Sequence, residues 1–73
     1  MRTIVQDSVD GSTWRDFYLL GEPLVFSSKK AAKVWFEDLI ETNNPDWRVG
    51  FLVRFRDGKF FRLVDRNGKQ VNP

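Results

Sequence analysis

Residues 47–69, WRVGFLVRFRDGKFFRLVDRNGK, decide the fold of this 73-residue chain. Two apolar runs, 49–55 and 60–64, lie on either side of the pair Asp57-Gly58. Asp-Gly between alternating apolar residues is among the strongest short-range signals for a β-hairpin. The stretch is therefore expected to begin with two antiparallel strands joined by a tight turn.

The length of the hairpin loop decides which side chains face the core. A two-residue loop would pair Phe55 with Phe60 and bury Arg62. A three-residue loop, with Gly58 in the left-handed conformation, pairs Phe55 with Lys59 instead. We expect the three-residue loop, because an unpaired buried Arg is costly. The expected core face then consists of Phe51, Val53, Phe55, Phe61 and Leu63, and the opposite face of Leu52, Arg54, Phe60, Arg62 and Val64.

A second turn pair, Asn67-Gly68, predicts a third and shorter strand over residues 69–72, so that the whole stretch forms a β-meander. The meander also holds most of the positive charge, with seven basic and two acidic side chains, whereas the residues before it carry a net negative charge. If the protein binds a partner, we expect this sheet to be involved.

The first quarter of the chain is expected to form a second hairpin. Residues 3–5 are β-prone, Asp10-Gly11 is a turn signal, and 14–20 alternates in strand fashion. The segment 14–20 also fits a helix capped by Thr13 and ended by Gly21. Its aromatic residues and the preceding Asp-Gly favour the strand. A short extended apolar segment, Leu24-Val25-Phe26, follows.

Residues 28–42 are predicted to form the helix. Ser27 or Ser28 can cap it, and Asn43-Asn44-Pro45 ends it. Its apolar residues follow the spacing of a buried stripe: Ala32, Trp35, Phe36, Leu39 and Ile40.

The charges of this helix oppose its macrodipole, because its lysines lie toward the positive end and its carboxylates toward the negative end. One interpretation is that water and salt absorb the mismatch, helped by a Lys33–Glu37 pair one turn apart. The other is that one charged cluster is retained for a partner.

Together these elements predict a single domain over residues 1–73 of the α+β class. It has two layers, with an N-terminal β-hairpin, one α-helix and a C-terminal antiparallel β-meander. A domain of this size buries only about 60% of its unfolded surface. The seven Phe and three Trp residues therefore have to supply much of its stability.

Several kinds of chemistry are missing from the sequence. The chain has no His and no Cys, so it lacks the usual general base, thiol nucleophiles, disulfides and the preferred zinc ligands. No Gly-rich phosphate loop is present. We therefore expect no enzymatic activity, no cofactor and no metal. No apolar run reaches the roughly 18 residues of a membrane span, and the N-terminus lacks the apolar core of a signal peptide.

Two kinds of binding remain open. Exposed apolar side chains flanked by Arg are typical of protein-binding hot spots. Arginines interleaved with an aromatic residue also suit single-stranded nucleic acid, and residues 48–55 match the RNA-recognition strand motif at three positions. The residues expected to bind a partner are Arg48, Arg54, Arg56, Phe60, Arg62 and Lys69.

The whole chain, from MRTIVQDSVDG through SSKKAAKVWFEDLIE to FLVRFRDGKFFRLVDRNGK, resembles small regulators of host RNA polymerase encoded by lytic Xanthomonas phages. The resemblance rests on size and layout and assigns no individual binding residue. It implies a protein that binds the β and β′ subunits of bacterial RNA polymerase in the host cytoplasm. It also implies that sigma-factor engagement is disturbed and that transcription reads through terminators.

The leading hypothesis is therefore a stoichiometric polymerase-binding regulator that is monomeric and does not contact a membrane. A small single-stranded nucleic-acid-binding domain is the alternative, and direct nucleic-acid contact by a polymerase regulator would be secondary. A general interaction module that inhibits another host protein is a third possibility.

Overall fold

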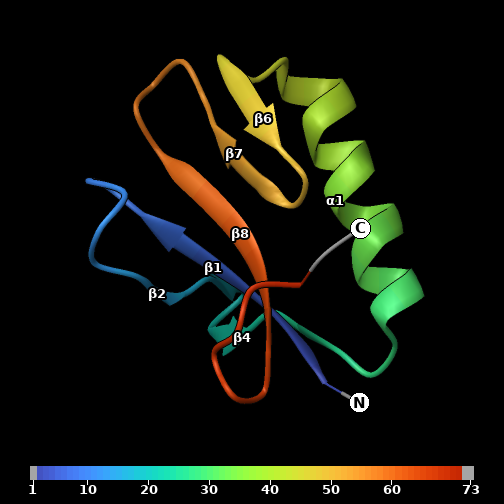
Figure 1. The fold of residues 1–73 in the computed structure, drawn as a ribbon. Coiled ribbons are helices and arrows are strands. Elements are labelled where there is room, and N and C mark those ends of the chain that lie inside the picture. Colours follow the sequence, from blue (N-terminus) through green and yellow to red (C-terminus); the bar gives the residue numbers. More distant parts are fainter. Residues whose placement is uncertain (1, 72–73) are drawn as a thin grey trace.

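The computed structural model describes residues 2–71, and these form an α+β fold with one helix packed across one face of a mostly antiparallel sheet (Figure 1). The elements follow the predicted order of hairpin, helix and meander. In chain order they are β1 (Thr3–Ser8), β2 (Arg15–Asp16), β3 (Tyr18–Leu19), β4 (Glu22–Pro23), β5 (Val25–Phe26), α1 (Lys29–Asn43), β6 (Trp47–Val49), β7 (Leu52–Arg54) and β8 (Phe60–Asp65).

The β7–β8 hairpin has the predicted three-residue loop. The Phe55 N–H donates to the Lys59 carbonyl at 2.8 Å, and the Gly58 N–H donates back to the Phe55 carbonyl at 2.9 Å. Gly58 has a φ of 91°, a conformation in which a side chain would be strained. This register places Val53 opposite Phe61, so the alternation of buried side chains follows the expected core face.

The meander also contains a strand that was not predicted, β6, which precedes β7. The apolar run 49–55 does not form one strand, because the chain reverses at Gly50, which has a φ of 59°. The reversal pairs Trp47 with Arg54. After β8 the chain turns back at Asn67-Gly68 as expected and pairs with β8 again, because Gln70 bridges Val64 and the Val71 N–H donates to the Leu63 carbonyl at 2.9 Å. Asn72 lies outside the described residues.

Strand β1 is an interior strand of the sheet, whose order is β2-β1-β8-β7-β6 with β5 also paired to β1. It pairs with β8 along its whole length, and its other edge pairs with both β2 and β5. Gln6 lies opposite Asp16, so the N-terminal hairpin forms as expected, and residues 14–20 form strands rather than a helix, although they divide into β2, paired with β1, and β3, paired with β4. Between β2 and β5 the chain extends as a short β3–β4 ribbon.

The helix begins and ends where its capping residues predict. Ser28 is the N-cap, and its Oγ accepts the Ala31 N–H at 3.0 Å. Asn44 ends the helix in the left-handed conformation, with its N–H donating to the Ile40 carbonyl at 3.0 Å. Of the predicted stripe, Ala32 and Phe36 are fully buried. The remaining members pack more shallowly against the core: Trp35, Leu39 and Ile40.

The core is largely aromatic. Phe36 of the helix meets Phe51 edge to face at a centroid distance of 5.5 Å, and Phe61 meets Phe17 and Phe55 at 5.3 and 5.6 Å. All five residues of the expected core face are buried: Phe51, Val53, Phe55, Phe61 and Leu63.

Val64 was expected on the exposed face but is fully buried. Ile4 lies beside it on β1, and Gln70 lies beside it on the returning chain. A residue that has a neighbouring strand on each side can be shielded from water even on the sheet face that the helix does not cover. The alternation of residues within one strand does not show which segments lie beside it.

The helix is tied to the edge of the sheet by an ion pair that the helical spacing did not predict. Glu37 binds the guanidinium of Arg48 on β6 in bidentate fashion, with N–O distances of 2.7 and 2.6 Å. This contact lowers the pKa of Glu37 and raises the pKa of Arg48. Glu37 therefore pairs with the sheet instead of Lys33, whose Nζ lies 5.4 Å from the centroid of Phe51.

Within residues 2–71, the only helix is too short and too polar to cross a bilayer. The same residues contain no group of three or more carboxylates placed to hold a metal ion.

Candidate binding surface

The sheet face opposite the helix carries a row of alternating aromatic and arginine side chains. The strand pairings bring together Phe60 and Arg62 of β8, Arg54 of β7 and Trp47 of β6, and Trp14 joins them from the chain before β2. We call this set the aromatic–arginine row: the rings of Trp14 and Trp47 and the guanidinium of Arg54 surround Phe60, and Arg62 stacks on Trp14.

Phe60 lies at the middle of the row. Its ring meets Trp14 at a centroid distance of 6.4 Å and Trp47 at 6.0 Å, both in edge-to-face orientation. The ring also lies directly over Gly11, where a Cβ atom would come within 3.1 Å of it. Gly11 has a φ of 78°, so both its backbone conformation and this contact favour glycine.

Arg62 is held in place rather than free. Its guanidinium donates to Gln6 Oε1 at 3.0 and 2.8 Å and stacks 4.2 Å from the centroid of the Trp14 ring. The amide of Gln6 in turn donates to Asp16 at 3.1 Å. Partial burial lowers the pKa of Arg62, because the charged form loses water. The guanidinium and the indole therefore form one rigid unit.

Arg54 is held on the other side of Phe60. Its guanidinium lies 2.6 Å from the carboxylate of Asp46 and 5.8 Å from the centroid of the Phe60 ring. The carboxylate of Asp46 therefore offsets the charge of Arg54, whereas Arg62 is bound by the neutral amide of Gln6. The row is a polar–aromatic surface in which one of the two arginine charges has a carboxylate partner.

The other expected binding residues lie apart from the row. Arg48 points toward the helix, where Glu37 binds it. Arg56 lies in the β7–β8 loop, at a shallow cleft of about 360 Å³. Lys69 belongs to the turn after β8 and is exposed. The structure thus brings together three of the six: Arg54, Phe60 and Arg62.

Trp14 and Trp47 belong to the row but were not expected there. Trp47 pairs with Arg54 only because the chain reverses at Gly50, and that turn has no strong sequence signal. Trp14 is placed by the β1–β2 pairing, which the sequence left open. The one sequence feature that indicated a binding role for these two residues is that both are large aromatic side chains near turns.

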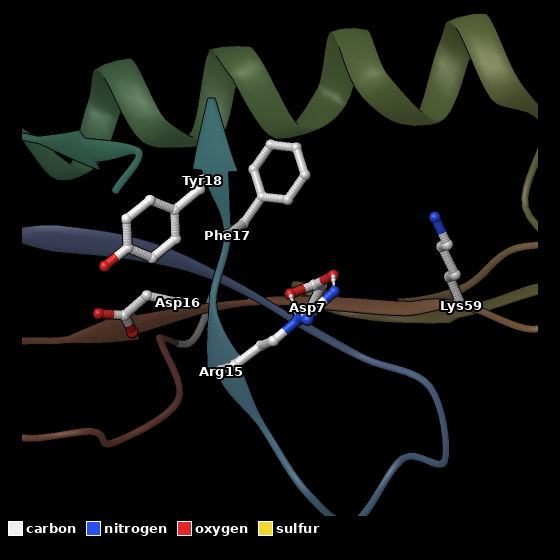
Figure 2. Close-up of a pocket in the computed structure, with 6 residues that line it drawn as sticks. All are labelled: Asp7, Arg15, Asp16, Phe17, Tyr18 and Lys59. Atoms are coloured by element: carbon white, nitrogen blue, oxygen red, sulfur yellow. Dashed lines mark hydrogen bonds and ion pairs between the residues drawn. The ribbon is translucent and has the colours of Figure 1, made fainter. Parts of the chain in front are cut away.

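A second concave region lies along β1 and β2, with a volume of about 520 Å³ (Figure 2). Its floor contains Asp7, which is buried and bound by Arg15 at 3.2 Å. Tyr18 and Lys59 lie at opposite sides of this region in Figure 2. The carboxylate of Asp7 already has a cationic partner, so the ion pair accounts for its burial.

No protein-family model matches the chain, and no curated protein and no solved structure is significantly similar to it.

The geometry predicts that Arg48 is dispensable for binding. Arg48→Ala removes its pair with Glu37, which is solvent-exposed, so the free energy of unfolding should fall by at most about 1 kcal/mol. Affinity for a partner on the opposite sheet face should stay within twofold, roughly. Titration calorimetry and thermal melting of the variant test this. A large loss of affinity with unchanged melting would place the binding site on the helix side.

The loop beneath Phe60 predicts that the stability of the protein falls at low pH. Asp10 accepts the N–H groups of Thr13 and Ser12 at 2.8 Å each and the Ser8 hydroxyl at 2.9 Å. These bonds, led by that from Thr13, lower the pKa of Asp10 from 3.8 to about 2. A lowered folded-state pKa stabilises the protein above the unfolded value, and that contribution is lost as the pH falls from about 4 to 2. An NMR titration should give the lowered pKa, and a normal value for Asp10 would contradict this loop geometry.

Proposed function

We propose that this protein is a non-catalytic regulator that binds bacterial RNA polymerase through the aromatic–arginine row. The proposed partners are the β and β′ subunits in the cytoplasm of a phage-infected host. Binding would disturb sigma-factor engagement and promote reading through terminators. The choice of polymerase follows from the resemblance of the chain to phage-encoded polymerase regulators, and the choice of surface follows from the geometry.

The observation that carries the choice of surface is the continuous contact of three aromatic rings and two guanidinium groups on one sheet face. Trp and Arg are the residues most enriched in binding hot spots, and pre-ordered side chains lose little entropy on docking. Trp47 is 39% exposed, so it can still bury area against a partner. The ion pair between Arg54 and Asp46 favours a protein surface, because phosphate binding relies on uncompensated positive charge.

Single-stranded nucleic acid is the second candidate. The row has three rings in sequence, and bases stack on such rings at roughly 1–3 kcal/mol each. The two row arginines could also contact phosphates once Asp46 or Gln6 releases them. This candidate predicts binding that weakens steeply with salt.

The test compares the intact protein with purified core polymerase and with fluorescent oligonucleotides, each at two salt concentrations. The proposal expects saturable one-to-one binding to polymerase and inhibition of promoter-dependent transcription at matching concentrations. Oligonucleotide binding with a steep salt dependence, and none to polymerase, would replace it with the second candidate. Turnover of any substrate by far less than one protein per target would overturn the non-catalytic reading.

A further inference from the structure

The β3–β4 ribbon ends in an exposed apolar tip that the proposed surface does not include. Tyr18 and Leu19 of β3 are 61% and 48% exposed, and Leu20 in the turn is 98% exposed. We call these three residues the hairpin tip. Apolar side chains gathered in this way at a protruding turn are typical of sites that dock into another molecule.

The turn at the tip is built with an unfavourable residue. Leu19 pairs with Glu22, so Leu20 and Gly21 form a two-residue turn. Both have positive φ, 54° and 83°. Turns of this kind favour Asn-Gly, because Asn tolerates the left-handed conformation and a bulky residue does not. Leu20 therefore carries backbone strain without gaining any burial within its own chain.

Because Leu20 is both strained and exposed, its side chain indicates a contact with another molecule. A strained residue persists when the site needs its side chain, and here the side chain contacts water in the isolated protein. The ribbon itself is anchored: the Leu24 N–H donates to the Phe17 carbonyl at 2.9 Å, and Phe17 packs on Phe61 in the core. The hairpin tip thus protrudes from the protein, while the base of its ribbon is held by a hydrogen bond and by core packing.

The charges near the tip select the kind of partner. Glu22 lies directly opposite Leu19 at the turn, whereas Arg15, which is paired with Asp7, and Lys59 line the concave region beside Tyr18. The carboxylate of Glu22 at the turn disfavours anionic lipid and nucleic acid. It suits a protein surface in which an apolar pocket has basic residues at its border.

We propose that the hairpin tip inserts Leu20 into an apolar, basic-bordered pocket of the same protein partner that binds the aromatic–arginine row. This inference rests on the proposed function, since it names a second contact in that complex. It predicts that Leu20 lowers the stability of the free protein and raises the affinity of the complex.

The test uses Leu20→Asn and Leu20→Met in the full chain, with purified bacterial core polymerase as the probe. Asn relieves the strained turn, so the melting temperature should rise by about 4 °C or more. It also removes the apolar anchor, so affinity should fall about tenfold or more. Met keeps an apolar side chain and should bind within about threefold of the parent.

Each outcome decides a different point. If Leu20→Asn binds polymerase as tightly as the parent, the tip is not a contact and this inference is wrong, while the proposed function stands. If the parent itself does not bind, the proposed function is wrong and the second contact falls with it. Weaker binding by both Leu20→Asn and Leu20→Met, with unchanged melting, would show that shape rather than an apolar anchor matters and would also overturn the inference.

Discussion

Phe61→Ala is expected to lower the free energy of unfolding by about 3–5 kcal/mol, as truncation of a core aromatic residue does. Phe61 is 9% exposed and packs edge to face on both Phe17 and Phe55. Its loss leaves a cavity between the sheet and the β2–β3 segment. A domain of this size has only about 5–15 kcal/mol of stability, so much of the population should unfold near 37 °C. Urea denaturation followed by circular dichroism measures the effect.

Phe60→Ala is the matched control for that variant. Phe60 is the neighbouring residue on β8, but it lies on the opposite face and is only partly buried. Its truncation removes two edge-to-face contacts with tryptophan, which are worth about 0.5–1.5 kcal/mol each beyond the area they bury. Phe60→Ala should therefore remain folded. Collapse of Phe60→Ala beside a stable Phe61→Ala would invert the register of the β7–β8 hairpin.

A variant combining Trp47→Ala with Arg54→Glu is expected to weaken polymerase binding at least about thirtyfold, because the loss of even one hot-spot residue costs about 2 kcal/mol or more. Both side chains lie at the accessible end of the row, and the β6 edge is exposed. Arg62 is left unchanged in this variant. Gln6 holds its guanidinium against Trp14, so reversing its charge would disturb the sheet as well as the surface.

The control for this variant lies on the helix. Two helix variants serve as controls. Lys29→Glu combined with Lys30→Glu changes the net charge more than the row variant does, and Val34→Ala truncates an apolar side chain that is 56% exposed. Both should bind polymerase as the parent does, with folding confirmed by circular dichroism. If the helix variants lose binding and the row variant keeps it, the binding site lies on α1, and the lysines that oppose the helix dipole were the better guide.

The elements with strong local signals could be predicted from the sequence. Asp57-Gly58 and the alternation around it were enough to set the register of β7 and β8, because burying Arg62 in the core was the costly alternative. Ser28 and Asn44 mark the helix ends through their own hydrogen bonds. In this hairpin and at the helix ends, residues close together in the sequence determine the local structure.

The composition of the candidate surface could not be predicted in the same way, because it depends on pairings between distant segments. Trp14 reaches Phe60 only through the β1–β2 and β1–β8 pairings, which join residues far apart in the chain. The charge count of residues 47–69 was also misleading as a guide to one surface. It treated Arg48, Arg56 and Lys69 as neighbours of Arg54, whereas the fold sends them to different sides.

The pairing of β1 with β8 has a consequence for biosynthesis. Thr3 lies opposite Asp65, so the first strand of the fold has its central partner only after residue 65 has been translated. Until then β1 has one unsatisfied edge, and such an edge invites pairing with other chains. Folding is therefore expected to follow translation rather than accompany it, and a ribosome-bound chain halted before β8 should remain sensitive to protease along its whole length.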